Sequence, residues 1–146
     1  LYEEQYAKSL GKYADYAICN TIWFNPKADM TRTVSAAFKK LFPKDELVFH
    51  GANVGYTYDA VMIAADAFKR ARSTDPKALA DAIRQTNIPV ANRMSLGGPI
   101  KFNAKGQVEG NLSACIQNLN MRPTVVLPAA SAEAKPVFPV PGYKKA

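Results

Sequence analysis

The sequence predicts a mixed α/β fold, and three observations carry that prediction. The first is a long apolar helix from Gly55 to Arg72, GYTYDAVMIAADAFKRAR. Its apolar residues recur at i, i+3, i+4 and i+7, and further apolar residues widen this stripe enough to suggest packing on a sheet. The second is a set of strand-like apolar runs near both ends of the chain. The third is the presence of shorter amphipathic helical patterns between those runs.

Both ends of this central helix carry local signals. Lys69, Arg70 and Arg72 stand in its last turn, where cations complement the negative end of the helix dipole. At its start, Gly55 predicts a glycine turn that feeds the first helical residues. Such a turn would leave backbone N–H groups free, an arrangement that holds anionic ligands in some proteins.

The elements before the central helix follow from local patterns. Residues 1–10 read as a helix without a capping residue at its start, and Gly11 stops it. Residues 13–21, YADYAICNT, are predicted to form a strand that is buried on both faces. Asp29 is predicted to cap a helix that runs through Phe42, which the next residue, a proline, ends.

The elements after the central helix are marked by turn residues. Asp75 as N-cap and Pro76 at the first helical position predict a new helix. The remaining predictions are a loop at 87–95, a short strand at 100–102, a tight turn at 103–106, and strands at 112–119 and 124–127 joined by 120–123.

This order of elements makes an awkward independent fold. One strand followed by three helices and a late group of strands leaves the long helix without an obvious sheet to cover. We therefore expect that partner elements are missing and that the chain alone exposes apolar surface. The organisation predicted is a folded part at 1–128 and a proline-rich extended tail at 129–146.

Composition is typical of a globular protein, with 48% hydrophobic and 21% charged residues in 146. The formal charge of +7 comes from scattered basic residues, so we interpret it as a solvated surface. No apolar run reaches the about 20 residues that a membrane-spanning helix needs. The chain starts at LYEEQYAK without an initiator Met or a visible signal peptide, which suggests a mature or trimmed piece. Cys19 and Cys115 are predicted to be buried thiols in preference to a disulfide, which an exported protein could still form.

The chemistry of catalysis is not evident in the sequence. The single histidine, His50, and scattered carboxylates provide no metal-ligand spacing, and no nucleotide-binding or nucleophile motif is present. His50 could pair with Cys19 or Cys115 in a nucleophilic site, but a loop or core histidine is the favoured interpretation. The sequence therefore predicts a protein that is not an enzyme and that uses no metal or cofactor.

Aromatic side chains at the ends of elements indicate binding instead. Tyr56 and Tyr58 stand at the predicted start of the central helix, and Trp23 with Phe24 stands in a turn after a strand. Ligand pockets of open α/β sheets gather at such ends. The alternative is that each ring is an ordinary core or rim residue.

A series of segments in this chain resembles a known family. The series is LGKYADYAICNTIWFNP, then GYTYDAVMIAADAFKRARSTDPKALADAIRQTNI, GGPIKFNAKGQ and ACIQNLNMRPTVVLP. In this order the segments resemble the C-terminal third of type I periplasmic binding proteins. The most similar group is the receptors for branched-chain amino acids and related carboxylates that serve ABC importers.

The resemblance implies a fold of two doubly wound α/β lobes that close on a small molecule, of which this chain would supply part of each lobe. It implies that Tyr58 faces the ligand and that Trp23, more weakly, lies near the cleft entrance. The segments that hold the carboxylate and ammonium of the ligand would precede Leu1, as would a signal peptide. The partners implied are the small molecule, the membrane subunits of the importer, and the rest of the polypeptide or another copy, in the periplasm.

Two other functions remain open on the sequence. One is a sensory domain of the same fold that binds a ligand without transport. The other is a nucleic-acid-binding module, which only the net charge favours and for which a basic stripe interleaved with aromatic residues is lacking.

Overall fold

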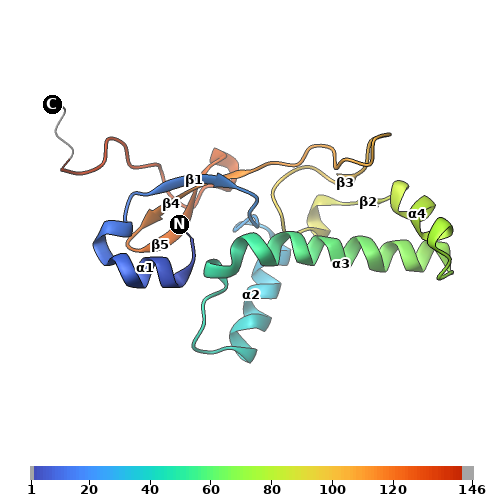
Figure 1. The fold of residues 1–146 in the computed structure, drawn as a ribbon, viewed down its shortest axis with the longest axis horizontal. Coiled ribbons are helices and arrows are strands. Elements are labelled where there is room, and N and C mark those ends of the chain that lie inside the picture. The colour runs from blue at the N-terminus through green and yellow to red at the C-terminus, as the bar shows by residue number, and fades with distance from the viewer. Residues whose placement is uncertain (1, 143–146) are drawn as a thin grey trace.

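A computed structural model describes residues 2–142 as a mixed α/β structure, which confirms the predicted class (Figure 1). A three-stranded sheet lies near one end of the longest helix, and a small two-stranded sheet and a short helix lie near the other. The elements in order are α1 (Glu4–Leu10), β1 (Ile18–Thr21), α2 (Asp29–Leu41), α3 (Gly51–Ala71), α4 (Pro76–Arg84), β2 (Asn87–Ile88), β3 (Ile100–Lys101), β4 (Ala114–Leu119) and β5 (Arg122–Leu127). Short 3-10 turns occupy Gly11–Ala14, Leu47–His50, Val90–Asn92 and Ala129–Ser131.

The larger sheet is antiparallel with the strand order β1-β4-β5. Strands β4 and β5 form a hairpin whose two turn residues, Asn120 and Met121, have φ angles of 55° and 60°. Positive φ at both positions is characteristic of a type I′ turn, whose twist matches that of the flanking strands. The connection is therefore two residues shorter than predicted, because β5 already begins at Arg122.

The predicted buried strand at 13–21 is wrong in length and in burial. Regular pairing covers only Ile18–Thr21, since Gly11–Ala14 form a 3-10 turn and Tyr16 has a φ of 64°. The strand alternates exposed and half-buried residues, and Ile18 is 53% exposed. The reason is position: among the described residues β1 pairs only with β4 and forms an edge of the sheet.

The helix α3 begins four residues earlier than predicted, at Gly51. Gly55 lies inside the helix, so the expected glycine turn with free N–H groups at that position is wrong. A β-carbon on Gly51 would lie 2.5 Å from the Trp23 indole, and one on Gly55 would lie 3.0 Å from the Phe24 backbone nitrogen. These glycines allow close approach of the segment that follows β1, and they do not form a turn.

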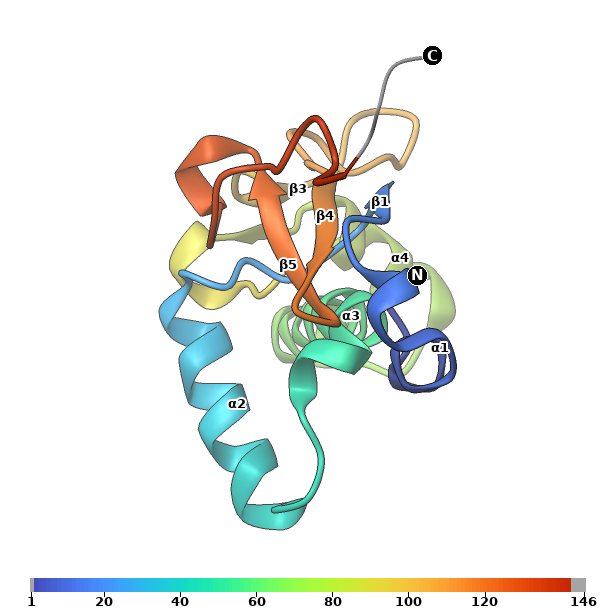
Figure 2. The same ribbon diagram turned by 90° about the vertical axis from the view of Figure 1, so that its left-hand side faces the viewer.

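The predicted packing of α3 on a sheet holds only at its start for the described residues, where Ala52 shares the core with Ala114, Ile116 and Val125 of the sheet. Its first turns lie against the Leu47–His50 turn and its second half packs on α4 (Figures 1 and 2). On the apolar stripe, Val61 is 61% exposed and Phe68 is 50% exposed. The chain thus exposes apolar surface, as expected for a fold that lacks partner elements.

The two predicted helix caps have different outcomes. Asp75 caps α4 as predicted, because its carboxylate accepts a hydrogen bond from the Ala78 nitrogen at 2.8 Å. Asp29 does not cap α2. Ala28 occupies that position, and Asp29 lies in the first turn, where its carboxylate pairs with Arg32.

The region after α4 is more regular than predicted. Two residues of the expected loop form β2, which pairs antiparallel with β3. The turn at 103–106 is confirmed: the Asn103 side-chain oxygen accepts hydrogen bonds from the Lys105 and Gln107 nitrogens, and Gly106 has a φ of 77°. None of the helices described has both the length and the apolar character needed to cross a bilayer.

The main core lies where the sheet, α3 and the Leu47–His50 turn meet. Its largest fully buried side chains include Trp23, Met94, Leu96 and Val125. The tail lies along the hairpin: Glu133 and Val137 exchange hydrogen bonds with Val125 and Gln117, respectively. Residues 143–146 of the predicted tail lie outside the described part.

Both cysteines are free, as predicted, but half-buried rather than fully buried. Cys19 is paired with Ile116, whereas Cys115 is paired with Asn20. Paired residues of an antiparallel sheet project to the same face and successive residues project to opposite faces, so the two thiols lie on opposite faces. Burial raises the pKa of the Cys19 thiol, with a smaller contribution from Cys115 in the same direction.

Candidate ligand-binding site

The hollow beside Tyr58 lies between α2 and the first half of α3. Its volume is about 350 Å³, and it is lined by Val34, Asn53, Val54, Thr57 and Tyr58. Burial raises the pKa of the Tyr58 phenol above its ordinary value of 10.0, and the neighbouring Asp59 carboxylate adds to the rise. The phenol is therefore protonated at neutral pH, when it can both donate and accept hydrogen bonds.

Tyr56 lies on a different side of α3 and is 46% exposed. Its hydroxyl donates a hydrogen bond to the Asn53 side-chain oxygen at 2.7 Å. Its ring borders a smaller pocket of about 140 Å³, whose polar lining includes Asp59 and Arg93. The two tyrosines thus belong to separate hollows. Asn53 bonds to Tyr56 but lines the hollow beside Tyr58.

Trp23 presents no surface to solvent, with an exposed fraction of 0%. Its ring stacks on Phe24 at 5.6 Å between centroids and meets Tyr2 edge-on at 5.2 Å. Within this chain it is a core residue that packs against the start of α3, because Gly51 lies directly against its indole. The structure therefore does not bring Trp23, Tyr56 and Tyr58 together in one hollow.

A buried ion pair between α3 and the segment after α4 was not predicted from the sequence. The Asp59 carboxylate accepts hydrogen bonds from the backbone nitrogens of Met94 at 2.7 Å and Ser95 at 3.2 Å, and also from the Ser95 hydroxyl. Arg93 lies 3.6 Å from the same carboxylate, and both residues are at least 95% buried. Burial lowers the pKa of Arg93, and the Asp59 charge acts against that lowering.

This network holds the segment after α4 against α3. Arg93 also donates to the Asn111 side-chain oxygen at 2.9 Å and to the Gly98 carbonyl. The only sequence signal was an aspartate that interrupts an apolar helix, Asp59, and nothing indicated its partner 34 residues later. Asn53 was missed because the helix was expected to begin after it.

The polar groups along the first half of α3 are suited to binding more than to catalysis. They are phenol and amide groups beside apolar walls, and the charges of Asp59 and Arg93 nearby are paired with each other. Within residues 2–142 no group of three or more His, Cys, Asp or Glu side chains is placed to hold a metal ion.

Comparison with known proteins identifies the class. Residues 1–117 match the model of the periplasmic binding protein family, and the chain belongs to that family. The leucine-binding protein LivK of Thermotoga maritima superposes with a TM-score of 0.65 and 21% identity over 84% of this chain. An ABC transporter substrate-binding protein of Desulfitobacterium hafniense gives TM-scores of 0.58 in its complex with Leu and 0.60 in a second structure, each at 20% identity over 84% of this chain.

The chain spans only part of these proteins. It covers 33% of the length of the Thermotoga protein and 38% of the Desulfitobacterium protein. The likeness shows that the chain has part of the periplasmic binding protein fold.

Proposed function

We propose that this chain is part of the small-molecule-binding subunit of an ABC importer, which closes an amino acid or a related carboxylate between two lobes in the periplasm. The family match over residues 1–117 is the observation that carries this proposal. It is supported by the fold neighbours, one named a leucine-binding protein and another a transporter component in complex with Leu. In this proposal residues 1–128 contribute to both lobes and residues 129–146 form a tail.

We further propose that the ligand contacts the first half of α3. Tyr58 offers a neutral phenol beside the apolar Val34 and Val54, a combination that suits the polar and apolar parts of an amino acid. Asn53 lines the same hollow and would extend its polar edge, and Tyr56 would act from the neighbouring hollow through its hydrogen bond to Asn53. Trp23 would contribute by packing against the start of α3. The partners of the protein would be the small molecule, the membrane subunits of the importer, and the rest of its polypeptide or another copy.

The basic surface gives little support to nucleic-acid binding. Several of its side chains are paired with carboxylates on the same helix, as in Arg70 with Asp66 at 2.6 Å and Arg84 with Asp81 at 2.8 Å. Such local pairs leave no continuous basic stripe along these helices for a phosphate backbone to follow.

The test is isothermal titration calorimetry of the complete polypeptide with L-leucine and a panel of amino acids and aromatic carboxylates. We expect saturable binding of at least one compound, weakened about tenfold or more by Tyr58→Ala through loss of ring contacts and a hydrogen bond. Binding of none of them would contradict the proposal. Deletion of the gene with uptake intact would favour a sensory role of the same fold.

A further inference from the structure

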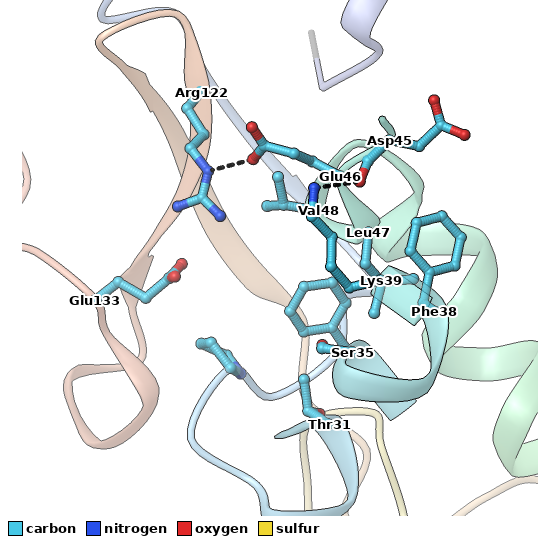
Figure 3. A pocket seen from close by; sticks show the side chains of 12 residues that line it. Thr31, Ser35, Phe38, Lys39, Asp45, Glu46, Leu47, Val48, Arg122 and Glu133 are labelled. Atoms are coloured by element: carbon cyan, nitrogen blue, oxygen red, sulfur yellow. Dashed lines mark hydrogen bonds and ion pairs between the residues drawn. The ribbon is translucent and has the colours of Figure 1, made fainter. Parts of the chain in front are cut away.

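A second large hollow lies between α2, the Leu47–His50 turn and β5 (Figure 3). Its volume is about 430 Å³, which is within the range of about 300–1,000 Å³ typical of small-molecule pockets. It shares no lining residue with the hollow beside Tyr58. Its apolar walls come from Phe24, Phe38, Leu47 and Val48.

The rim of this hollow carries charges of both signs. Arg122 approaches Glu46 at 3.3 Å, and the Lys39 ammonium lies 3.5 Å from the Asp45 carbonyl oxygen. On the side of the tail, the Glu133 carboxylate accepts a hydrogen bond from the Val125 nitrogen at 2.9 Å. Figure 3 shows the Asp45 carboxylate directed away from the hollow. The two positive charges of Lys39 and Arg122 on this rim are therefore matched by the two negative charges of Glu46 and Glu133.

A buried hydroxyl supplies an independent observation. Thr31 lines the hollow, is only 3% exposed, and its hydroxyl has no hydrogen-bond partner among the described residues. Buried polar groups nearly always have a partner in folded proteins, because an unpaired one loses its hydration without compensation. A bound molecule with an acceptor or donor would satisfy this hydroxyl.

We propose that this hollow is a second binding site, separate from that of Tyr58, for a small zwitterion with an apolar side chain, such as a free apolar α-amino acid. Its carboxylate would pair with Arg122 and its ammonium with Glu46 or Glu133, while Phe24 and Phe38 contact the side chain. A purely anionic ligand would be repelled by the two carboxylates of the rim. A purely cationic ligand would be repelled by Lys39 and Arg122.

The test uses methyl NMR of the complete polypeptide, labelled at Leu and Val methyl groups and titrated with L-leucine. Leu47 and Val48 report on this hollow, whereas Val34 and Val54 report on the one beside Tyr58. We expect saturable shifts at Leu47 and Val48. Shifts confined to Val34 and Val54 would overturn this proposal and leave the proposed function intact, and no shift at Leu47 and Val48 would overturn it as well.

Two substitutions test the chemistry of the site. Arg122→Gln should raise the dissociation constant reported by Leu47 and Val48 about tenfold or more, through loss of a charge-assisted hydrogen bond. Thr31→Val, which keeps the side-chain shape, should also raise this dissociation constant. The matched control is Arg84→Gln, because Arg84 pairs with Asp81 on α4 and does not line the hollow.

Leucine analogues without the amino group or without the carboxylate should bind this hollow at least about tenfold more weakly than L-leucine. Equal binding of either analogue would overturn the assignment to a zwitterion. An Arg122→Gln variant that binds like Arg84→Gln would overturn the site itself.

Discussion

The two halves of α3 differ in how completely this chain surrounds them. In the first half, Gly51, Ala52, Gly55 and Asp59 are buried beneath Trp23, Phe24 and the segment after α4. In the second half Ala67 is the one buried residue, although the apolar stripe continues. An apolar helix face is stable only against a partner. The partners of the first half therefore lie within this chain, and we expect those of the second half to lie in the rest of the fold.

The largest effect is expected in the buried first half, at Asp59. Replacement Asp59→Asn leaves the Arg93 charge unpaired in the interior, and removal of one partner of a buried ion pair costs about 3–5 kcal/mol. Urea unfolding of the complete polypeptide measures this loss. The matched control is Asp66→Asn on the same helix, whose pair with Arg70 is partly exposed and should cost less than about 1 kcal/mol. Equal effects of the two substitutions would contradict the assignment.

The second prediction asks whether the second half of α3 has a partner in the complete polypeptide. If the missing elements cover the stripe, Phe68→Ala should cost about 3–5 kcal/mol there, as for a buried aromatic residue. Leu41→Ala, at an exposed position on α2, serves as the comparison. A loss below about 1 kcal/mol at Phe68, measured by urea unfolding, would show that the stripe stays uncovered in the whole protein.

The third prediction concerns the close approach of Trp23 to α3. Gly51→Ala places a methyl group 2.5 Å from the indole, and such overpacking costs about 1–3 kcal/mol. Gly55→Ala should cost less, because its nearest atom lies at 3.0 Å. Thermal unfolding of the two variants compares the sites. A Gly51→Ala protein as stable as the original would mean that the rings do not pack in this way.

The smallest effect is on pH dependence, through Tyr58. Because its pKa is raised in the fold, the folded state favours the neutral phenol. Its contribution to stability is complete below the ordinary pKa of 10.0 and is lost as the pH rises above it. Ultraviolet titration of the protein minus that of Tyr58→Phe should show a phenol that ionises above this value. A difference spectrum that titrates below it would contradict the described environment.

Elements that depend on neighbouring residues were predicted well. The Asp75 cap and the turn at Asn103 were identified because a side chain bonds to backbone only a few residues away, and the strands of the C-terminal hairpin were identified from their local strand-like patterns. The ordered series of segments also gave the family correctly. The incorrect prediction of a cap at Asp29 shows the limit of such signals, since this carboxylate pairs with Arg32 and does not cap the helix.

Features that depend on residues distant in the chain were not predicted. Burial of residues 13–21 was overestimated because an apolar run does not indicate whether a strand has neighbouring strands on both sides or only on one. Gly51 and Gly55 could not be assigned as contact points for Trp23 and Phe24 from composition alone. For the same reason the Arg93 partner of Asp59 was missed.

The sequence by itself determined most of the helices, the strands of the C-terminal hairpin, the Asp75 cap, the turn at Asn103 and the family, because these depend on periodicity and on contacts between near neighbours. The tertiary structure decided which side of α3 is enclosed, and it placed Tyr56 and Tyr58 in separate hollows and Trp23 in the core. Those outcomes depend on close packing between segments that are tens of residues apart, where a few tenths of an ångström decide whether side chains fit.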